Sequence, residues 1–266
     1  MNPLNWGTEI YGALVVAMLL LCLVVPWSAS ALTRFVEEVC LILPAGLFYF
    51  LVRGLVHANV SVAEAHAERI VALERPLGLF VEPNLQAAIG DHSVLIDLFN
   101  WIYVWGHWPV ILGWVVWMWS RHHHAYPLYR NAVLLSGAAG MIVFALYPLV
   151  PPRLMPELGV TDTVSLRSHF YRTFQPPSLT NLYASMPSLH FGWNLIVGVA
   201  ITRHAKNLLG RTFGAMLPIA MFSAIVFTAN HYILDGIVGG VIAFAGLAVS
   251  AHVTSVIPRQ SNDGKA

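Results

Sequence analysis

Histidine, aspartate, serine and arginine gather at three places in this chain where apolar stretches begin or end. Arg153 lies in VPPRL, directly after one such stretch. Ser188 and His190 lie in MPSLH, where another begins, and His231 and Asp235 lie in NHYILD, at the start of the last one. An ionisable side chain at the edge of a membrane-type segment is costly unless it is used or paired. The three motifs are therefore candidates for one chemical site.

The spacing of His231 and Asp235 predicts an orienting pair. Residues four apart share one face of a helix, and a carboxylate bonded to one imidazole nitrogen fixes the tautomer of the ring. The other nitrogen is then available as a nucleophile or a base. HxxxD alone is a weak pattern, because a satisfied polar pair inside a membrane helix is an equally ordinary reading. The prediction therefore depends on the three motifs together.

The MPSLH motif predicts an anion site at the start of a helix. Pro187 suits the first helical turn, so the amides of Ser188 and its neighbours are expected at the positive end of the helix dipole. His190 is placed to protonate a departing oxygen. Arg153 carries a planar fork that matches the oxygens of a phosphate, although taken alone it is more typical of an interfacial arginine. The set predicts phosphoryl transfer without a metal, through a phosphohistidine.

Composition indicates that the elements which position these motifs lie in a membrane. Of the 266 residues, 57% are hydrophobic and 10% are charged, whereas about a quarter of a soluble domain is charged. The net charge of +1 gives no case for nucleic-acid binding. Cys22 and Cys40 lie in or beside apolar stretches and are expected to be buried rather than to form a disulfide scaffold.

Apolar stretches of spanning length predict an all-α integral membrane protein with one domain over residues 1–266. We expect a helical bundle of about seven transmembrane spans, at 10–27, 36–56, 94–119, 131–150, 189–201, 212–229 and 233–256. The fifth stretch is short, and its polar start is expected to continue the helix to the interface. The first span is expected to be retained, because no Lys or Arg precedes its apolar core as in a signal peptide.

Residues 58–93 differ from the spans because they mix charges with apolar residues. They are expected to form one or two amphipathic helices in the interface. Their solvated side is predicted to carry Glu64, Glu68, Glu74 and Arg75.

Basic residues in the loops predict the orientation in the plasma membrane. The loops 121–130 and 203–211 and the tail 259–265 carry Arg and Lys, which favour the cytoplasmic side. Alternation then places the 58–93 segment, the 151–187 loop and the start of the last span at the outer face. That outer loop also contains arginines, at positions 153, 167 and 172, and anion binding explains them better than topology does.

The three motifs resemble the type 2 phosphatidic acid phosphatase superfamily of integral-membrane lipid phosphatases. YPLVPPRL, MPSLHFGW and NHYILD, within residues 147–240, are most similar to its branch of inositol phosphorylceramide synthases, and so is ALERPLGLFVEPNLQ. The resemblance implies a six-helix core, with 10–27 as an additional span. It also implies that His231 attacks phosphorus and His190 protonates the leaving group. Asp235 then orients the nucleophile, and Arg153 and Ser188 hold the phosphate.

Two departures from the phosphatase pattern bear on the reaction. Leu146 and Ile225 occupy positions where that pattern has a lysine and an arginine. Arg167, His169 and Arg172 are the candidates to compensate. The inositol-transferase branch also lacks this basic set, so transfer to an alcohol such as inositol stands beside hydrolysis.

We expect an enzyme that acts on a lipid phosphate or a phospholipid head group, as a phosphatase or a head-group phosphotransferase. No cofactor, metal or nucleic-acid partner is expected. The alternative is a catalytically silent transporter or scaffold with the same fold. The intact His190, His231 and Asp235 argue against that alternative.

Overall fold

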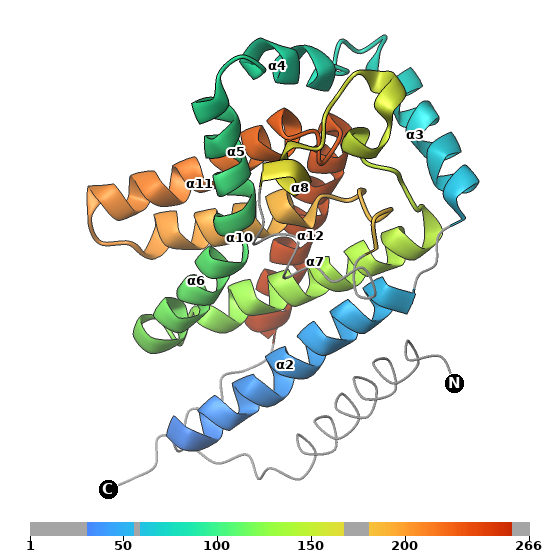
Figure 1. Cartoon of the computed structure of the whole chain (residues 1–266). Coiled ribbons are helices and arrows are strands. Elements are labelled where there is room, and N and C mark those ends of the chain that lie inside the picture. Colours follow the sequence, from blue (N-terminus) through green and yellow to red (C-terminus); the bar gives the residue numbers. More distant parts are fainter. Residues whose placement is uncertain (1–30, 56–58, 168–180, 257–266) are drawn as a thin grey trace, which may run out of the picture.

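The computed structural model describes residues 31–55, 59–167 and 181–256, and in these ranges the chain is helical, without a named strand (Figure 1). The predicted span 10–27 lies outside them. The α-helices are α2 (Ala31–Leu55), α3 (Val60–Glu74), α4 (Glu82–Ile89), α5 (Ser93–Trp105), α6 (Trp108–Arg121), α7 (Tyr126–Leu146), α8 (Thr163–Arg167), α10 (Leu189–His204), α11 (Leu208–Phe227) and α12 (Ile233–Val256). Two short 3-10 helices, η1 (Pro152–Leu154) and η2 (Pro156–Leu158), follow α7.

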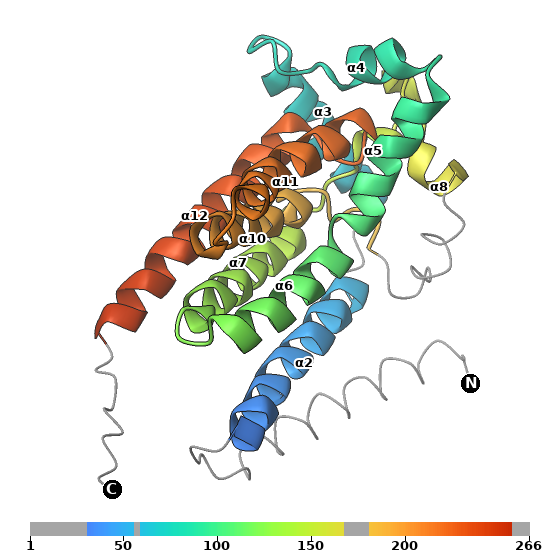
Figure 2. The same ribbon diagram turned by 90° about the vertical axis from the view of Figure 1, so that its left-hand side faces the viewer.

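Helix α10 lies at the centre of the bundle and packs against α7, α11 and α12 (Figure 2). Small residues allow these close approaches. A Cβ added at Gly192 of α10 would lie 2.7 Å from the carbonyl oxygen of Gly239 in α12. A Cβ added at Gly198 would lie 2.5 Å from the carbonyl oxygen of Gly214 in α11. Side chains of α10 and α12 that carry chemistry are therefore held at fixed separation.

Three helices of the described part are long and apolar enough to cross a membrane: α7, α11 and α12. This supports a membrane protein with a helical bundle, while the predicted count of seven spans is not established by it. One predicted span was wrong as drawn, because the 94–119 stretch forms two helices, α5 and α6. The chain turns at Gly106 and His107, just before Pro109, which cannot donate to the preceding turn.

The start of α10 also differs from the prediction. Ser188 caps the helix with its side chain, so the polar residues before it are not helical. The helix gains length at its other end and continues to His204.

Helices α3 and α4 lie across one end of the bundle, the end at which α12 begins (Figures 1 and 2). An apolar stripe of α3, including Ala67 and Ile70, packs with Tyr232 at the start of α12. The 121–130 loop lies at the other end of the bundle, because the His122 ring is 5.2 Å from that of His204. His204 is 14 residues along α10 from His190, or about 21 Å at 1.5 Å per residue.

Candidate active site

His231 lies in the turn between α11 and α12, and hydrogen bonds fix this turn. The backbone amides of Asn230 and His231 both donate to the Ile225 carbonyl, at 3.0 and 3.2 Å. The Asn230 side chain donates to the Thr228 hydroxyl at 2.8 Å. Helix α12 begins at Ile233. The prediction that His231 and Asp235 share a helical face was therefore wrong, and the turn brings them together instead.

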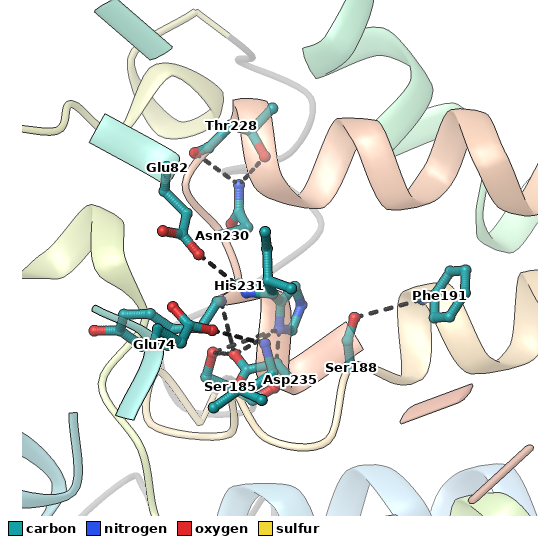
Figure 3. Close-up of polar contacts among 12 residues, drawn as sticks. Glu74, Glu82, Ser185, Ser188, Phe191, Thr228, Asn230, His231 and Asp235 are labelled. Atoms are coloured by element: carbon teal, nitrogen blue, oxygen red, sulfur yellow. Dashed lines mark hydrogen bonds and ion pairs between the residues drawn. The ribbon is translucent and has the colours of Figure 1, made fainter. Parts of the chain in front are cut away.

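The imidazole of His231 is held through its Nδ1 atom (Figure 3). Nδ1 lies 2.9 Å from the carbonyl oxygen of Ser185 and 3.4 Å from Asp235 Oδ2. Both neighbours are acceptors, so they favour the tautomer with the proton on Nδ1. This leaves Nε2 as the nitrogen with a lone pair. The ring is buried, at 5% exposure, so its orientation is restricted as well.

Asp235 joins the two sequence motifs. Its Oδ2 accepts the hydroxyl proton of Ser185 at 2.5 Å and the amide proton of Tyr232 at 3.1 Å. Its backbone carbonyl accepts the amide proton of Ser188 at 2.9 Å. The carboxylate therefore lies beside the His231 ring, with Oδ2 3.4 Å from Nδ1, while the backbone of the same residue fixes the start of α10.

Ser188 is fully buried at the N-terminus of α10, but it is not arranged as predicted. Its amide donates to Asp235 rather than pointing outward, and its hydroxyl oxygen accepts the Phe191 amide proton at 3.4 Å. The Ser188 amide is thus already used, which corrects the expected anion site. Its hydroxyl hydrogen is the group that remains suited to a phosphate oxygen.

His190 lies in the first turn of α10, in a group of aromatic rings. Its ring centroid is 5.8 Å from that of His231, so the structure brings the two predicted histidines together. The His190 ring also contacts the rings of Tyr103 and His107, with centroids 4.5 and 4.2 Å away. His107 is buried, and its Nδ1 lies 3.1 Å from the amide nitrogen of Asn194. The break between α5 and α6 brings His107 to this position.

Arg153 is anchored beside the same turn. Its amide donates to the Ala229 carbonyl at 2.8 Å, and its Nη1 pairs with Asp162 Oδ2 at 2.7 Å. Its Nε is buried and has no hydrogen-bond partner among the described residues. The guanidinium is thus partly neutralised by a carboxylate, while its buried Nε has no acceptor among the described residues.

The residues expected to supplement Arg153 are not gathered around it. Arg167 pairs with Asp97 of α5 at 2.9 Å, in an exposed ion pair that screening weakens. His169 and Arg172 lie outside the described residues. Leu146 is 77% exposed at the end of α7, and Ile225 is buried in α11.

Two carboxylates near His231 were missed by the sequence analysis, which placed Glu74 on the solvated side of its helix. Glu74 and Glu82 both have 0% exposure. Glu82 Oε1 accepts the Ile233 amide proton at 3.0 Å, and Glu74 Oε1 accepts that of Leu234 at 2.7 Å (Figure 3). Burial, with Glu82 and Asp235 nearby, raises the pKa of Glu74 to about 8, and burial also raises that of Glu82.

A signal for Glu74 was present in the sequence. The buried positions of α3 include Ala63, Ala67 and Ile70, and Glu74 follows at the next helical step of four residues. Its position on the apolar stripe therefore indicated burial, against the preference of its residue type. Ser185 had no comparable signal, because its contacts depend on the fold of a loop.

Comparison with known proteins adds one finding. The family model described as the PAP2 superfamily matches residues 68–249. These residues contain the Arg153, Ser188, His190, His231 and Asp235 positions, together with Glu74 and Glu82. No curated protein and no solved structure matched the chain.

Proposed function

We propose that this chain, which belongs to the PAP2 superfamily, transfers a phosphoryl group from a lipid phosphate or a phospholipid head group through a phosphohistidine. Membership of the superfamily supports phosphatase or phosphotransfer chemistry on lipid phosphates in general. The assignment of roles to particular residues, and the choice between hydrolysis and transfer, belong to the proposal.

The observation that carries the proposal is the arrangement around His231. Nδ1 is held by two oxygens, from Ser185 and Asp235, and the His190 ring lies 5.8 Å away. An oriented nucleophile beside a second imidazole is the arrangement that a two-step displacement requires. A histidine that served packing alone would not need a carboxylate and a carbonyl on the same nitrogen.

In the first proposed step, Nε2 of His231 forms a bond to phosphorus as the bond to the leaving oxygen breaks. Protonated His190 gives its proton to that oxygen, so the lipid product leaves as an alcohol. Asp235 and the Ser185 carbonyl stabilise the positive charge on the His231 ring. Arg153 and the Ser188 hydroxyl are proposed to hold the phosphoryl oxygens.

In the second step, an acceptor hydroxyl attacks the phosphohistidine. His190 takes the acceptor's proton as the nitrogen–phosphorus bond breaks, which restores both histidines. Water as acceptor gives hydrolysis, and an alcohol such as inositol gives head-group transfer. Few positive charges are available to hold the phosphate, which favours transfer over hydrolysis. Arg153 is partly neutralised by Asp162, and the apolar Leu146 and Ile225 add no charge.

The deciding experiment incubates the purified chain with a panel of lipid phosphates and phospholipids, with and without inositol, and identifies products by mass spectrometry. Free phosphate without inositol would establish hydrolysis. Inositol phosphate that forms only when inositol is present, with the lipid released as its alcohol, would establish transfer. If neither forms with any substrate, and no phosphorylated protein is trapped, the alternative of a silent transporter or scaffold replaces the proposal.

The location of the site at the outer face of the plasma membrane is also proposed. It is supported by the basic loops 121–130 and 203–211, which lie at the end of the bundle away from His231. Single cysteines at positions 123 and 157, in a variant lacking the native cysteines, are expected to react with an impermeant thiol reagent from inside and outside the cell, respectively. The reverse labelling would invert the orientation.

A further inference from the structure

Glu74 and Glu82 are buried carboxyl groups that the proposed chemistry does not use directly. They come from two different helices, α3 and α4, and bind the first two amides of α12. Their other oxygens, Glu74 Oε2 and Glu82 Oε2, are buried and accept no hydrogen bond from the described residues. Two acidic side chains at one helix N-terminus complement its dipole, but two buried charges side by side repel each other.

The charged groups that act most strongly on this pair are negative. The titratable groups that act on Glu74 are Glu82 and Asp235, and the same Asp235 acts on Glu82. Tyr232, beside them, is influenced by both glutamates, by Asp235 and by the exposed Glu157. All these groups are acidic. Three ionised carboxylates near His231 would also repel a phosphate, so a proton on the pair serves both the fold and the site.

We propose that Glu74 and Glu82 are positioning residues that share one proton, cap the first turn of α12 and thereby hold His231 and Asp235 in place. The proton gives one of the unsatisfied oxygens a donor and removes one buried negative charge. The remaining negative charge still faces the helix N-terminus. This inference rests on the proposed function for its catalytic consequence, but the shared proton and the cap are properties of the fold.

The shared proton predicts how stability depends on pH. Burial raises the pKa of Glu74 from an ordinary value of 4.5 to about 8, so the folded chain holds this proton more strongly than the unfolded chain does. Stability from this source is present below about pH 4.5 and is lost progressively as the pH rises through about 8. A glutamine at position 74 copies the protonated acid, since it keeps an acceptor oxygen and supplies a donor.

The test measures the melting temperature of the full chain in detergent from pH 5 to pH 8.5, for wild type, Glu74→Gln and Glu74→Ala. Glu68→Gln is the matched control, because Glu68 is exposed on the same helix. We expect the melting temperature of wild type and Glu68→Gln to fall with rising pH, and that of Glu74→Gln to fall much less. Glu74→Ala should melt lower at every pH, because the Leu234 amide loses its acceptor.

Turnover supplies the second readout. We expect Glu74→Gln to keep kcat within about threefold at pH 7 and to retain activity to higher pH than wild type. Glu74→Ala should lose about 10- to 100-fold in kcat with little change in KM, since the buried Leu234 amide would be left without its acceptor. Glu82→Gln should also weaken the pH dependence, because it removes the charge that repels ionised Glu74.

The outcomes separate this inference from the proposed function. If wild type turns over no substrate but Glu74→Gln still loses the pH dependence of melting, the pair stands and the proposed reaction fails. If the enzyme is active and Glu74→Gln melts with the wild-type pH dependence, the shared proton is refuted. Equal loss in Glu74→Gln and Glu74→Ala would show that Glu74 acts as an anion rather than as an acid.

Discussion

The Ser185 hydroxyl donates to Asp235 Oδ2 at 2.5 Å, and this bond joins the loop before α10 to the first turn of α12. It fixes the carboxylate that contacts His231. We expect Ser185→Ala to lower kcat by about 10- to 100-fold, the range for one hydrogen bond to a charged group. Asp235→Asn should cost about 10³- to 10⁴-fold, by analogy with other orienting carboxylates. Ser120→Ala, at an exposed site, is the control. Equal kcat values for Ser185→Ala and this control would show that Ser185 does not contribute to catalysis.

Leaving groups distinguish the two histidines. His231→Ala should abolish turnover of every substrate, because His231 is proposed to bond to phosphorus. His190→Ala should be inactive on a lipid phosphate, whose leaving group is a lipid alkoxide that must be protonated. The same variant should be partly active on nitrophenyl phosphate, whose leaving group needs little protonation. The measurement is turnover of both substrates by both variants, with trapping of labelled phosphoprotein. If nitrophenyl phosphate restored the turnover of His231→Ala instead, the roles of nucleophile and proton donor would have to be reversed.

The Arg153–Asp162 ion pair predicts that substitutions of its two residues change substrate binding in opposite directions. Arg153→Lys keeps the charge but loses the planar fork, so KM for a lipid phosphate should rise about 10- to 100-fold. Asp162→Asn removes the competing anion and should lower KM. Arg167→Gln, from the exposed pair with Asp97, should change KM less than about threefold. A rise of KM in Asp162→Asn would mean that Asp162 orients Arg153 rather than competing for it.

The contact between α10 and α12 predicts a position that accepts no side chain. A Cβ at Gly239 would lie 2.3 Å from the Ser188 carbonyl oxygen, and backbone cannot move aside as a flexible side chain does. Gly239→Ala should therefore destabilise the fold by roughly 1–3 kcal/mol and lower kcat. Gly113→Ala, where a Cβ meets nothing within 4 Å, should not destabilise it. Thermal unfolding of the two variants makes the comparison.

Metal independence is the remaining prediction. A histidine nucleophile needs no metal-bound water, so activity should survive extended treatment with a chelator. Vanadate, which adopts the five-coordinate geometry of the transferring phosphorus, should inhibit in competition with substrate. Activity that is lost in chelator and restored by magnesium would contradict the phosphohistidine mechanism.

The sequence predicted those parts of the fold that depend on apolar length and on residue spacing. Apolar stretches located the ends of α7, α11 and α12 to within five residues, because their hydropathy persists over a full span. The same criterion joined α5 and α6 into one span. Gly106 and His107 break the helix, but the two residues are too few to divide the apolar stretch.

The candidate site was predictable where its residues belong to motifs, and not where they act through tertiary contact. Arg153, His190 and His231 were found from their motifs. Ser185 and Asp162 act through loop conformations that local spacing does not encode. Glu74 was placed on the wrong side of its helix, because residue type was given more weight than the period of the buried stripe.

The two bonds that cap α12 join residues 151 and 160 positions apart, Glu82 with Ile233 and Glu74 with Leu234. At roughly 5–20 residues per second, ribosomes make the start of α12 about 8–30 s after they make α3 and α4. Until then both glutamates have no helix end to bind, and the aqueous interface is where they remain ionised at least cost. Their burial, and the uptake of the shared proton, must therefore accompany the insertion of α12. A chain that still lacks α12 cannot hold His231 in a reactive position, so activity begins only after α12 has been made and inserted.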